Sequence, residues 1–568
     1  MPSQSLSSRC SLATGCGLGA LLLLVACSAQ DAGSPGGKSE VPPASPVAQP
    51  ESLARMQESL AAPAPSSRAA GYAVESKKLM APAPDLLPPG YRDLPREQYQ
   101  HLADNPVREV ARDPVSTFSI DVDTGSYANV RRFLNGGQLP PADAVRLEEM
   151  VNYFPYQYPL PEGDAPFGIG IELAQTPWNP ETRLLRVAIR ASDSRVEQLP
   201  PANLVFLVDV SGSMDRREGL PMVQGTLKLL VDQLRPEDRV SLVTYAGDAR
   251  VVLESTSGRD KAKIRSAIDR LSAGGSTAGE SGIQLAYAEA QRGLIPGGIN
   301  RILLATDGDF NVGISDFDSL RRLAAEKRQG GVSLTTLGFG VDNYNERLME
   351  QLADAGDGNY AYIDTLREAR KVLVDQLAST LSVVARDVKL QLEFNPARVS
   401  EYRLLGYENR ALAREDFSDD KVDAGEIGAG HALTALYEIV PAGGKGWLEP
   451  LRYPSTPRAA GKADELAWLR VRYKTPGEAR SRLLERPIAA GDVANPPSED
   501  LRFAAAVAAF AQQLKGGRYT GDFSLDDSLR LARAARGDDP FGLRGEFVQL
   551  VELAQSLHTS APSHARNE

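Results

Sequence analysis

Cysteine is scarce in this chain of 568 residues. Its three cysteines are Cys10, Cys16 and Cys27, and none follows position 27. The sequence after that point therefore excludes a disulfide bond, a thiolate metal site and a cysteine nucleophile. The length exceeds that of one ordinary domain, so we expect about three or four domains.

Histidine is also scarce, and the chain has no surplus of positive charge. The four histidines are His101, His431, His558 and His564, and none belongs to an H-E-x-x-H pattern. A zinc hydrolase is therefore not expected, and acid–base catalysis would have to rest on carboxylates, lysine or tyrosine. The chain has 63 Lys and Arg against 74 Asp and Glu, a net charge of −11. This balance argues against nucleic acid as a partner, because phosphate binding needs a basic surface.

The N-terminus has the features of an export signal. Arg9 supplies a short positive region, and the apolar run at 18–26 is too short to span a bilayer, which takes roughly 20 residues. The run ends in Leu-Val-Ala before Cys27, which resembles the cleavage site of bacterial lipoproteins, where the cysteine carries the lipid. We therefore assign residues 1–27 to a lipoprotein signal peptide with lipidation at Cys27; the alternative is a plain secretory signal. The residue that follows the cysteine is Ser28 and not Asp, which favours anchoring in the outer membrane, on its periplasmic side or its surface.

Composition and periodicity divide the rest of the chain into five regions. Residues 28–100 are rich in Pro, Ala, Ser and Gly and are predicted to form a disordered tether. Mixed helical and strand patterns indicate a small α+β domain at 101–200. Short apolar strands alternate with amphipathic helices over 201–384, residues 385–490 are β-rich, and residues 491–568 are helical.

The central region predicts an α/β fold. Alternation of strands and helices over 201–384 is typical of a doubly wound, Rossmann-like and mostly parallel sheet, which binds ligands at the carboxyl ends of its strands. A single long helix is predicted to end this region, at 366–381.

The flanking regions predict a β-sandwich. Apolar residues alternate with polar ones from Val388 through Leu390 and Leu392 to Phe394, as in a strand with one buried face. We expect these later strands to pair with strands before residue 200, so that the α/β domain is inserted into a β-sandwich-like region.

Three motifs carry oxygen ligands to one edge of the predicted sheet. D-x-S-x-S begins at Asp209, directly after a buried strand, and places Ser211 and Ser213 in a tight turn. A Gly-Gly-Ser-Thr loop that ends at Thr277 and a T-D-G motif that contains Asp307 follow in order. Carboxylate and hydroxyl oxygens suit a hard cation such as Mg²⁺, which takes about six oxygen ligands.

In this order the motifs resemble the metal-ion-dependent adhesion site (MIDAS) of von Willebrand factor A (VWA) domains. The resemblance implies that Ser211, Ser213 and Thr277 ligate the metal through hydroxyls. It also implies that Asp209 and Asp307 act directly or through water, and that a carboxylate of a partner protein completes the coordination. With its flanks, the chain resembles bacterial VWA lipoproteins whose N- and C-terminal domains are uncharacterised.

Three other motifs do not indicate a functional site. Residues 121–126 start like a calcium-binding EF-hand loop, but Arg132 stands where the glutamate is needed, so a capped helix start is favoured. Residues 279–283 resemble a nucleophile elbow, but Ile283 replaces the final glycine. The Arg-Gly-Asp tripeptide at 536–538 is interpreted as a helix end.

The sequence therefore predicts a membrane-tethered module that binds proteins in a metal-dependent way, with Mg²⁺, Mn²⁺ or Ca²⁺ as the cation. The expected partner is an envelope protein that presents an Asp or Glu side chain. One alternative is a structural envelope scaffold with a vestigial metal site. The other is a metal-assisted hydrolase, which is not favoured because the sequence shows no nucleophile–base pair. We therefore do not expect an enzyme.

Overall fold

The computed structural model describes residues 97–120, 123–163, 165–193, 198–275, 279–308, 317–340, 344–449, 452, 464–491 and 493–560. The predicted signal peptide, Cys27 and nearly all of the predicted tether lie outside these ranges. Within them, no helix is long and apolar enough to cross a membrane.

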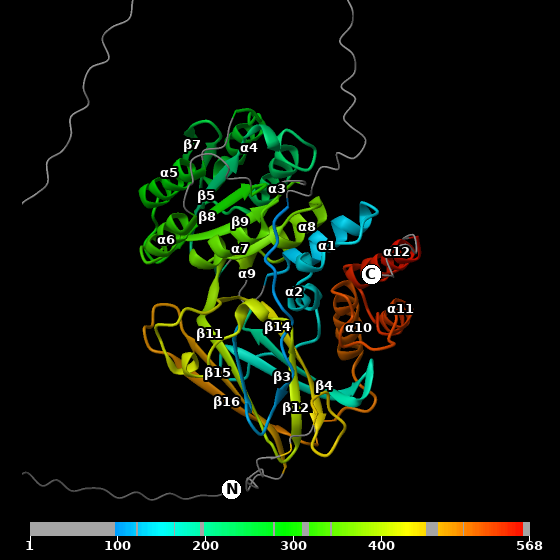
Figure 1. Cartoon of the computed structure of the whole chain (residues 1–568). Helices are drawn as coiled ribbons and strands as arrows, with labels where there is room; N and C mark the ends of the chain where they lie inside the picture. The colour runs from blue at the N-terminus through cyan, green and yellow to red at the C-terminus, as the bar shows by residue number, and fades with distance from the viewer. Residues whose placement is uncertain are drawn as a thin grey trace, which may run out of the picture. The chain divides into compact units, whose positions relative to one another are not determined.

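A six-stranded sheet forms the centre of the α/β domain (Figure 1). Its strands are β5 (Ala202–Asp209), β6 (Arg239–Tyr245), β7 (Ala249–Ser257), β8 (Ile299–Thr306), β9 (Ser333–Gly338) and β10 (Tyr360–Tyr362). The strand order is β10-β9-β8-β5-β6-β7, and only the pair β6–β7 is antiparallel. The predicted doubly wound, mostly parallel sheet is thus confirmed.

Helices cover both faces of this sheet. They are α3 (Leu220–Gln233), α4 (Lys261–Asp269), α5 (Gly279–Arg292), α6 (Phe317–Arg328), α7 (Glu346–Ala355) and α8 (Leu366–Arg370). Strand β5 shows how both faces are filled: Leu204 and Phe206 pack into the core under α3, α4 and α8, whereas Val205 and Leu207 pack under α5, α6 and α7. Every residue of β5 is buried, which explains why it has no polar alternation.

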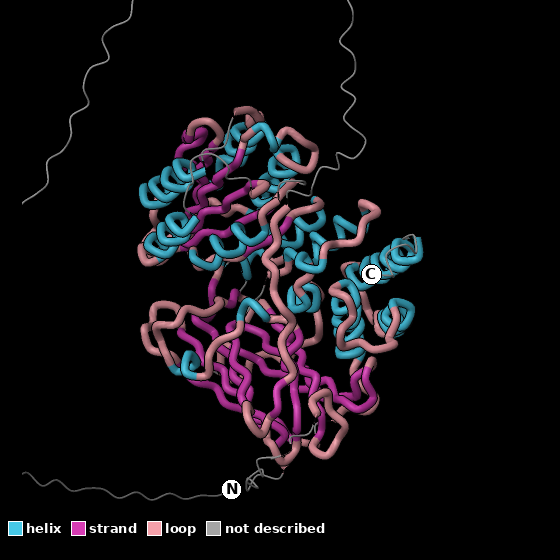
Figure 2. The backbone as a smooth tube through the Cα atoms, in the orientation of Figure 1, coloured by secondary structure: helices cyan, strands magenta, loops and turns pink. Residues whose placement is uncertain are grey.

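Two antiparallel sheets form a β-sandwich from both flanks of the chain, shown with the other strands in magenta in Figure 2. The N-terminal strands are β1 (Arg108–Glu109), β2 (Val115–Ser119), β3 (Phe167–Thr176) and β4 (Asn179–Ala191). The C-terminal strands are β11 (Val383–Phe394), β12 (Val399–Leu405), β13 (Ile427–Gly428), β14 (Ala432–Pro441), β15 (Glu465–Lys474) and β16 (Arg482–Ala489). One sheet has the order β1-β12-β14-β4-β3, and the other joins β13, β11, β15 and β16, with β2 paired to β11.

Strand pairing confirms that the α/β domain is an insertion. Strand β2 pairs with β11, β1 with β12 and β4 with β14, so each sheet contains strands from before and after the domain. The alternating residues Val388, Leu390, Leu392 and Phe394 all lie in the core between the two sheets. Their predicted buried face is thereby confirmed.

A helical layer covers the other face of the sheet that contains β14. It consists of α1 (Gly125–Asn135), α2 (Leu147–Asn152), α10 (Glu499–Leu514), α11 (Leu525–Ala534) and α12 (Leu543–Ser560). Leu184 of β4 and Leu436 of β14 belong to the same buried cluster as Phe503 and Phe547 of these helices. Both ends of the described chain therefore share one core.

The predicted helix at 366–381 is wrong as a continuous α-helix. It begins as α8, passes through a π-helical turn at Lys371–Asp375 and ends as α9 (Leu377–Leu381). The N–H of Gln376 donates to the carbonyl of Lys371, five residues earlier, and the Thr380 hydroxyl donates to the carbonyl of Val372 at 3.2 Å. The hydroxyl thus stabilises a carbonyl at the break, a contact that helical periodicity does not reveal.

The predicted helix start after residue 124 is present as α1. Thr124 stands at the N-cap position without a side-chain hydrogen bond. Instead, the backbone N–H of Ser126 donates to Oε2 of Glu149 at 2.8 Å, so a carboxylate from α2 satisfies this helix end. Asp121 and Val122 lie outside the described residues.

Candidate metal centre

Asp209 lies at the carboxyl end of the central strand. It is the last residue of β5, and its two neighbours, β6 and β8, run parallel to β5. Parallel strands bring their carboxyl ends to one edge, so Asp307, directly after β8, lies at the same edge. Asp209 is 0 % exposed and Asp307 is 3 % exposed.

The D-x-S-x-S turn brings two hydroxyl groups together. Oδ1 of Asp209 accepts a hydrogen bond from the backbone N–H of Ser211 at 2.9 Å, which shapes the turn directly after the strand. The Oγ atoms of Ser211 and Ser213 lie 3.0 Å apart. Ser211 is buried, whereas Ser213 is partly exposed, so the cluster reaches the surface.

The turn is also bound to the loop that leads to Thr277. The N–H of Gly212 donates to the carbonyl of Gly275, and the N–H of Gly274 donates to the carbonyl of Val210. These bonds bring the start of the predicted Gly-Gly-Ser-Thr loop against the two serines. Thr277 itself lies outside the described residues.

Two further side chains position Asp209, and the sequence analysis did not identify them. Thr306 donates its hydroxyl to Oδ2 of Asp209 at 2.9 Å, and the Tyr245 hydroxyl donates to the same atom at 3.2 Å. Thr306 is the first residue of the T-D-G motif, and Tyr245 ends β6. Both residues therefore stand at the carboxyl ends of predicted strands, which is the feature of the sequence that could have indicated them.

Glycine is required in the T-D-G motif. Gly308 has a φ of +80°, and a Cβ added there would lie 2.9 Å from the backbone nitrogen of Asn345. Both the left-handed backbone and the close approach exclude larger residues. The glycine thus fixes the turn that follows Asp307.

Electrostatics at this edge favour a cation. Burial, and then the negative charge of Asp307, raise the pKa of Asp209 to about 6, against the hydrogen bonds from Ser211 and Thr306. Within the part of this edge that the structure describes, the groups that donate to Asp209 belong to Ser211, Thr306 and Tyr245 and are neutral. A divalent ion next to two carboxylates and two hydroxyls would offset their repulsion, so these residues fit a hard cation.

The donor set differs from that of a carboxylate- or histidine-rich metal site. Among the described residues, no three His, Cys, Asp or Glu side chains come close enough together to hold a metal. At this edge, hydroxyl groups would have to supply the remaining ligands.

Comparison with known proteins identifies the domains. Residues 203–376 match the von Willebrand factor type A domain, residues 93–186 match a family described as von Willebrand factor, and residues 379–557 match "Uncharacterized protein YfbK, C-terminal". VWA domains generally mediate protein binding and often hold a divalent metal at a MIDAS.

Comparison with solved structures finds two proteins that resemble parts of this chain. A von Willebrand factor type A protein from Catenulispora acidiphila is 18 % identical, with a TM-score of 0.38 over 69 % of this chain and 91 % of that one. The proximal thread matrix protein 1 of the mussel byssus, described with a zinc-occupied MIDAS motif, is 21 % identical, with a TM-score of 0.26 over 33 % and 46 % of the two chains.

Sequence similarity over 81 % of the chain shows the family. "Uncharacterized protein YfbK" of Escherichia coli (strain K12) is 52 % identical over 469 residues, which are 81 % of each chain. "Uncharacterized protein sll0103" of Synechocystis is 32 % identical over 214 residues, 38 % of this chain and 50 % of that one. The chain therefore belongs to the YfbK family of VWA domain proteins and carries the YfbK C-terminal domain.

Proposed function

We propose that the protein is a binding module that grips an Asp or Glu side chain of another envelope protein through a divalent cation. The cation is Mg²⁺, Mn²⁺ or Ca²⁺, held by Asp209, Ser211, Ser213, Thr277 and Asp307. The observation that carries the proposal is the convergence of two buried carboxylates and a hydroxyl pair at one strand edge. With only two formal negative charges in its ligand set, a divalent ion stays electrophilic towards an incoming carboxylate.

The proposed role is binding and not catalysis. Among the described residues, the donors to Asp209 are hydroxyls and a backbone N–H, and none is a histidine or lysine. Burial raises the pKa of Tyr245, so its hydroxyl stays protonated and does not serve as a general base. A hydrolase would need such a base beside the metal-bound water. The alternative is a scaffold with a vestigial metal site, and the experiment below would support it if the protein did not bind the metal.

A thermal melt of the full chain in detergent tests the metal site. We expect EDTA to lower the melting temperature relative to saturating Mg²⁺ or Mn²⁺, because only the folded state assembles the ligands. A cation at about 100 times its Kd adds about 2.7 kcal/mol, or roughly 5–10 °C for a domain of this size. The double variant Asp209→Ala/Ser211→Ala should lose the shift.

The matched control carries the same two residue types on an exposed helix. Asp318→Ala/Ser319→Ala on α6 should keep the full metal-dependent shift. Equal melting curves with EDTA and with either cation in the parent protein would support the scaffold instead. Capture of an envelope protein in Mg²⁺ that persists in the Asp209→Ala variant would show that the metal does not grip the partner.

We also propose that a lipid on Cys27 holds the protein at the cell envelope, with the outer membrane favoured. The support is the apolar run that ends at this cysteine. Cells grown with labelled palmitate should label the parent chain and leave a Cys27→Ser variant unlabelled. Label on the variant, or none on either chain, would contradict the anchor.

A further inference from the structure

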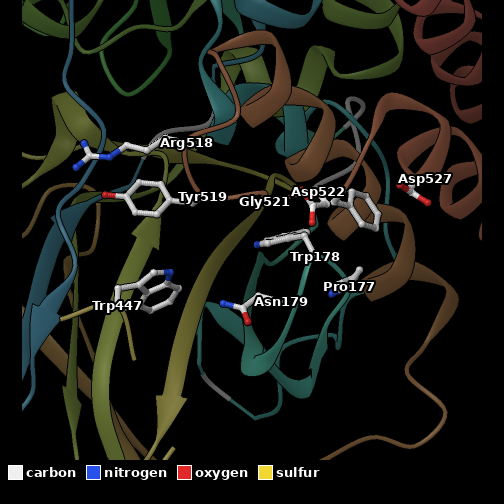
Figure 3. A pocket seen from close by; sticks show the side chains of 10 residues that line it. Pro177, Trp178, Asn179, Trp447, Arg518, Tyr519, Gly521, Asp522 and Asp527 are labelled. Atoms are coloured by element: carbon white, nitrogen blue, oxygen red, sulfur yellow. The ribbon is translucent and has the colours of Figure 1, made fainter. Parts of the chain in front are cut away.

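An aromatic pocket lies in the β-sandwich and helical region, away from the strand edge that carries Asp209. Its volume is about 670 Å³, within the range of small-ligand sites. The turn between β3 and β4, the segment after β14 and the connection from α10 to α11 build it. Its lining residues are Pro177, Trp178, Asn179, Trp447, Arg518, Tyr519, Gly521, Asp522, Phe523 and Asp527. Figure 3 shows Asp522 and Asn179 on opposite sides of the Trp178 ring.

Four of the residues that line the pocket are aromatic. Trp178 and Phe523 meet edge to face with ring centres 6.4 Å apart, and so do Trp447 and Tyr519 at 6.4 Å. Two of the three tryptophans of the chain are therefore in this one pocket. Among the described residues that line it, none is Leu, Ile or Val.

A buried carboxylate accepts a hydrogen bond from Trp178. Glu438 on β14 is 0 % exposed, and its Oε2 accepts from the indole N–H of Trp178 at 3.2 Å. The same carboxylate accepts from the Thr182 hydroxyl at 2.8 Å and from Nη2 of Arg403 at 2.8 Å. The indole N–H is thus used inside the protein, and Trp178 is 7 % exposed, so little of its ring is open to a ligand.

Arg403 extends this support to the second ring. Its Nη2 also donates to Oε1 of Gln512 on α10 at 2.9 Å, and its guanidinium carbon lies 3.9 Å from the centre of the Tyr519 ring. Arg403 is 3 % exposed. One buried ion pair therefore fixes rings from two separate segments, which reduces the entropy that a ligand must lose on binding.

The lining chemistry distinguishes between ligand classes. A lipid tail or an apolar side chain would be expected to meet Leu, Ile or Val, which are missing from the described lining. A proline-rich segment, the usual guest of aromatic grooves, has few N–H groups to donate to the carboxylate of Asp522. A sugar ring presents C–H groups to an aromatic face, and its hydroxyls donate to Asp522 and accept from Arg518.

We propose that this pocket binds a saccharide chain by stacking a sugar ring on the partly exposed Trp447, with Asp522 and Arg518 bonded to the hydroxyls. The site lies outside the metal centre and needs no metal. It would give the protein a second, glycan-directed contact, independent of its proposed protein partner.

Tryptophan fluorescence of the full chain, in a detergent without sugar, tests this site. In a Trp468→Phe background all indole emission comes from the two pocket tryptophans, because Trp468 is the third and lies on β15. The probes are the hexamers of β-1,4-linked N-acetylglucosamine and of β-1,4-linked glucose. We expect a saturable change with at least one of them, half-complete at or below about 1 mM.

Two variants assign the response to the pocket. Trp447→Ala should raise the half-saturating concentration about tenfold or more, with Trp178 still reporting. Asp522→Asn should raise the half-saturating concentration about threefold or more. Asp526→Asn is the matched control, because Asp526 is exposed and does not line the pocket, and it should leave this concentration unchanged. Unchanged melting temperatures show that the variants are folded.

The remaining outcomes overturn the proposal. No saturable change with either hexamer excludes a saccharide site, and a response confined to a peptide of residues 41–50 would assign the pocket to proline-rich segments. Binding that is lost in EDTA would belong to the metal centre. Preference for one hexamer over the other supports the site and shows whether it reads the acetamido group.

Discussion

At the scale of single residues, Glu346 illustrates the cost of buried charge. It lies at the start of α7, is 1 % exposed, and its closest cation, Nη2 of Arg146, is 4.0 Å away. Burial raises the pKa of Glu346 to about 8, against the charge of Arg146, and the nearby Glu350, Glu148 and Glu97 raise it further. The folded protein therefore holds a proton that the unfolded chain releases near pH 4.5.

This shift predicts a pH dependence of stability. Because the folded state binds the extra proton between about pH 4.5 and 8, the free energy of unfolding falls as pH rises, by at most about 1.4 kcal/mol per pH unit from this group. Glu346→Gln mimics the protonated side chain. We expect its stability relative to the parent to increase by about 2 kcal/mol between pH 5.5 and 7.5.

Urea unfolding at both pH values measures the effect. Glu326→Gln on α6 is the matched control, because that carboxylate is largely exposed and should leave the pH profile of the parent unchanged. If the Glu346→Gln and parent profiles ran parallel, the carboxylate would be ionised in the folded protein and the argument would fail.

At the scale of elements, Arg131 joins three helices from distant parts of the chain. From α1 it donates to Asp364 just before α8, to Glu368 in α8 at 2.8 Å, and to Glu546 in α12 at 2.9 Å. Arg131 and Glu368 are both 2 % exposed, so their charges are satisfied only by one another and by neighbouring groups such as Tyr153. Such a cluster specifies one arrangement of the three helices, because a misplaced partner would leave a charge buried alone.

The same elements show where sequence reasoning succeeded and where it stopped. Strand β11 and the turn after β5 were predictable, because alternation and the D-x-S-x-S spacing are local patterns. The carboxylate partners of Arg131 are 233, 237 and 415 positions away, so no local pattern contains them. The hydrogen-bond network of Glu438 behind the aromatic pocket could not be predicted for the same reason, since its members come from separate strands, a turn and a helix.

At the scale of the whole molecule, the α/β domain begins and ends at one turn of the sandwich. The N–H of Gly430 donates to the carbonyl of Ser192, and the N–H of Ala429 donates to the carbonyl of Ser382. Consecutive residues thus hold the chain directly before and after the insertion. Neither sheet of the sandwich contains a strand of the insertion.

We therefore predict that the sandwich folds without its insertion. Replacement of residues 193–381 by four glycines, which span up to about 13 Å, should keep cooperative urea unfolding and the near-ultraviolet circular dichroism of the sandwich aromatics. The stability should fall, because Arg131 loses Asp364 and Glu368 while its charge stays partly buried.

The matched control removes a strand of the sandwich instead. Deletion of β4 takes away the partner of β14 and the core residues Leu185, Val187 and Ile189, which contribute about 1.5–3 kcal/mol each when fully buried. That chain should lose the cooperative transition of the sandwich. If the chain without the insertion lost it as well, the α/β domain would be part of the folding unit of the sandwich, and the shared turn at residues 429–430 would not be enough to define an independent insertion.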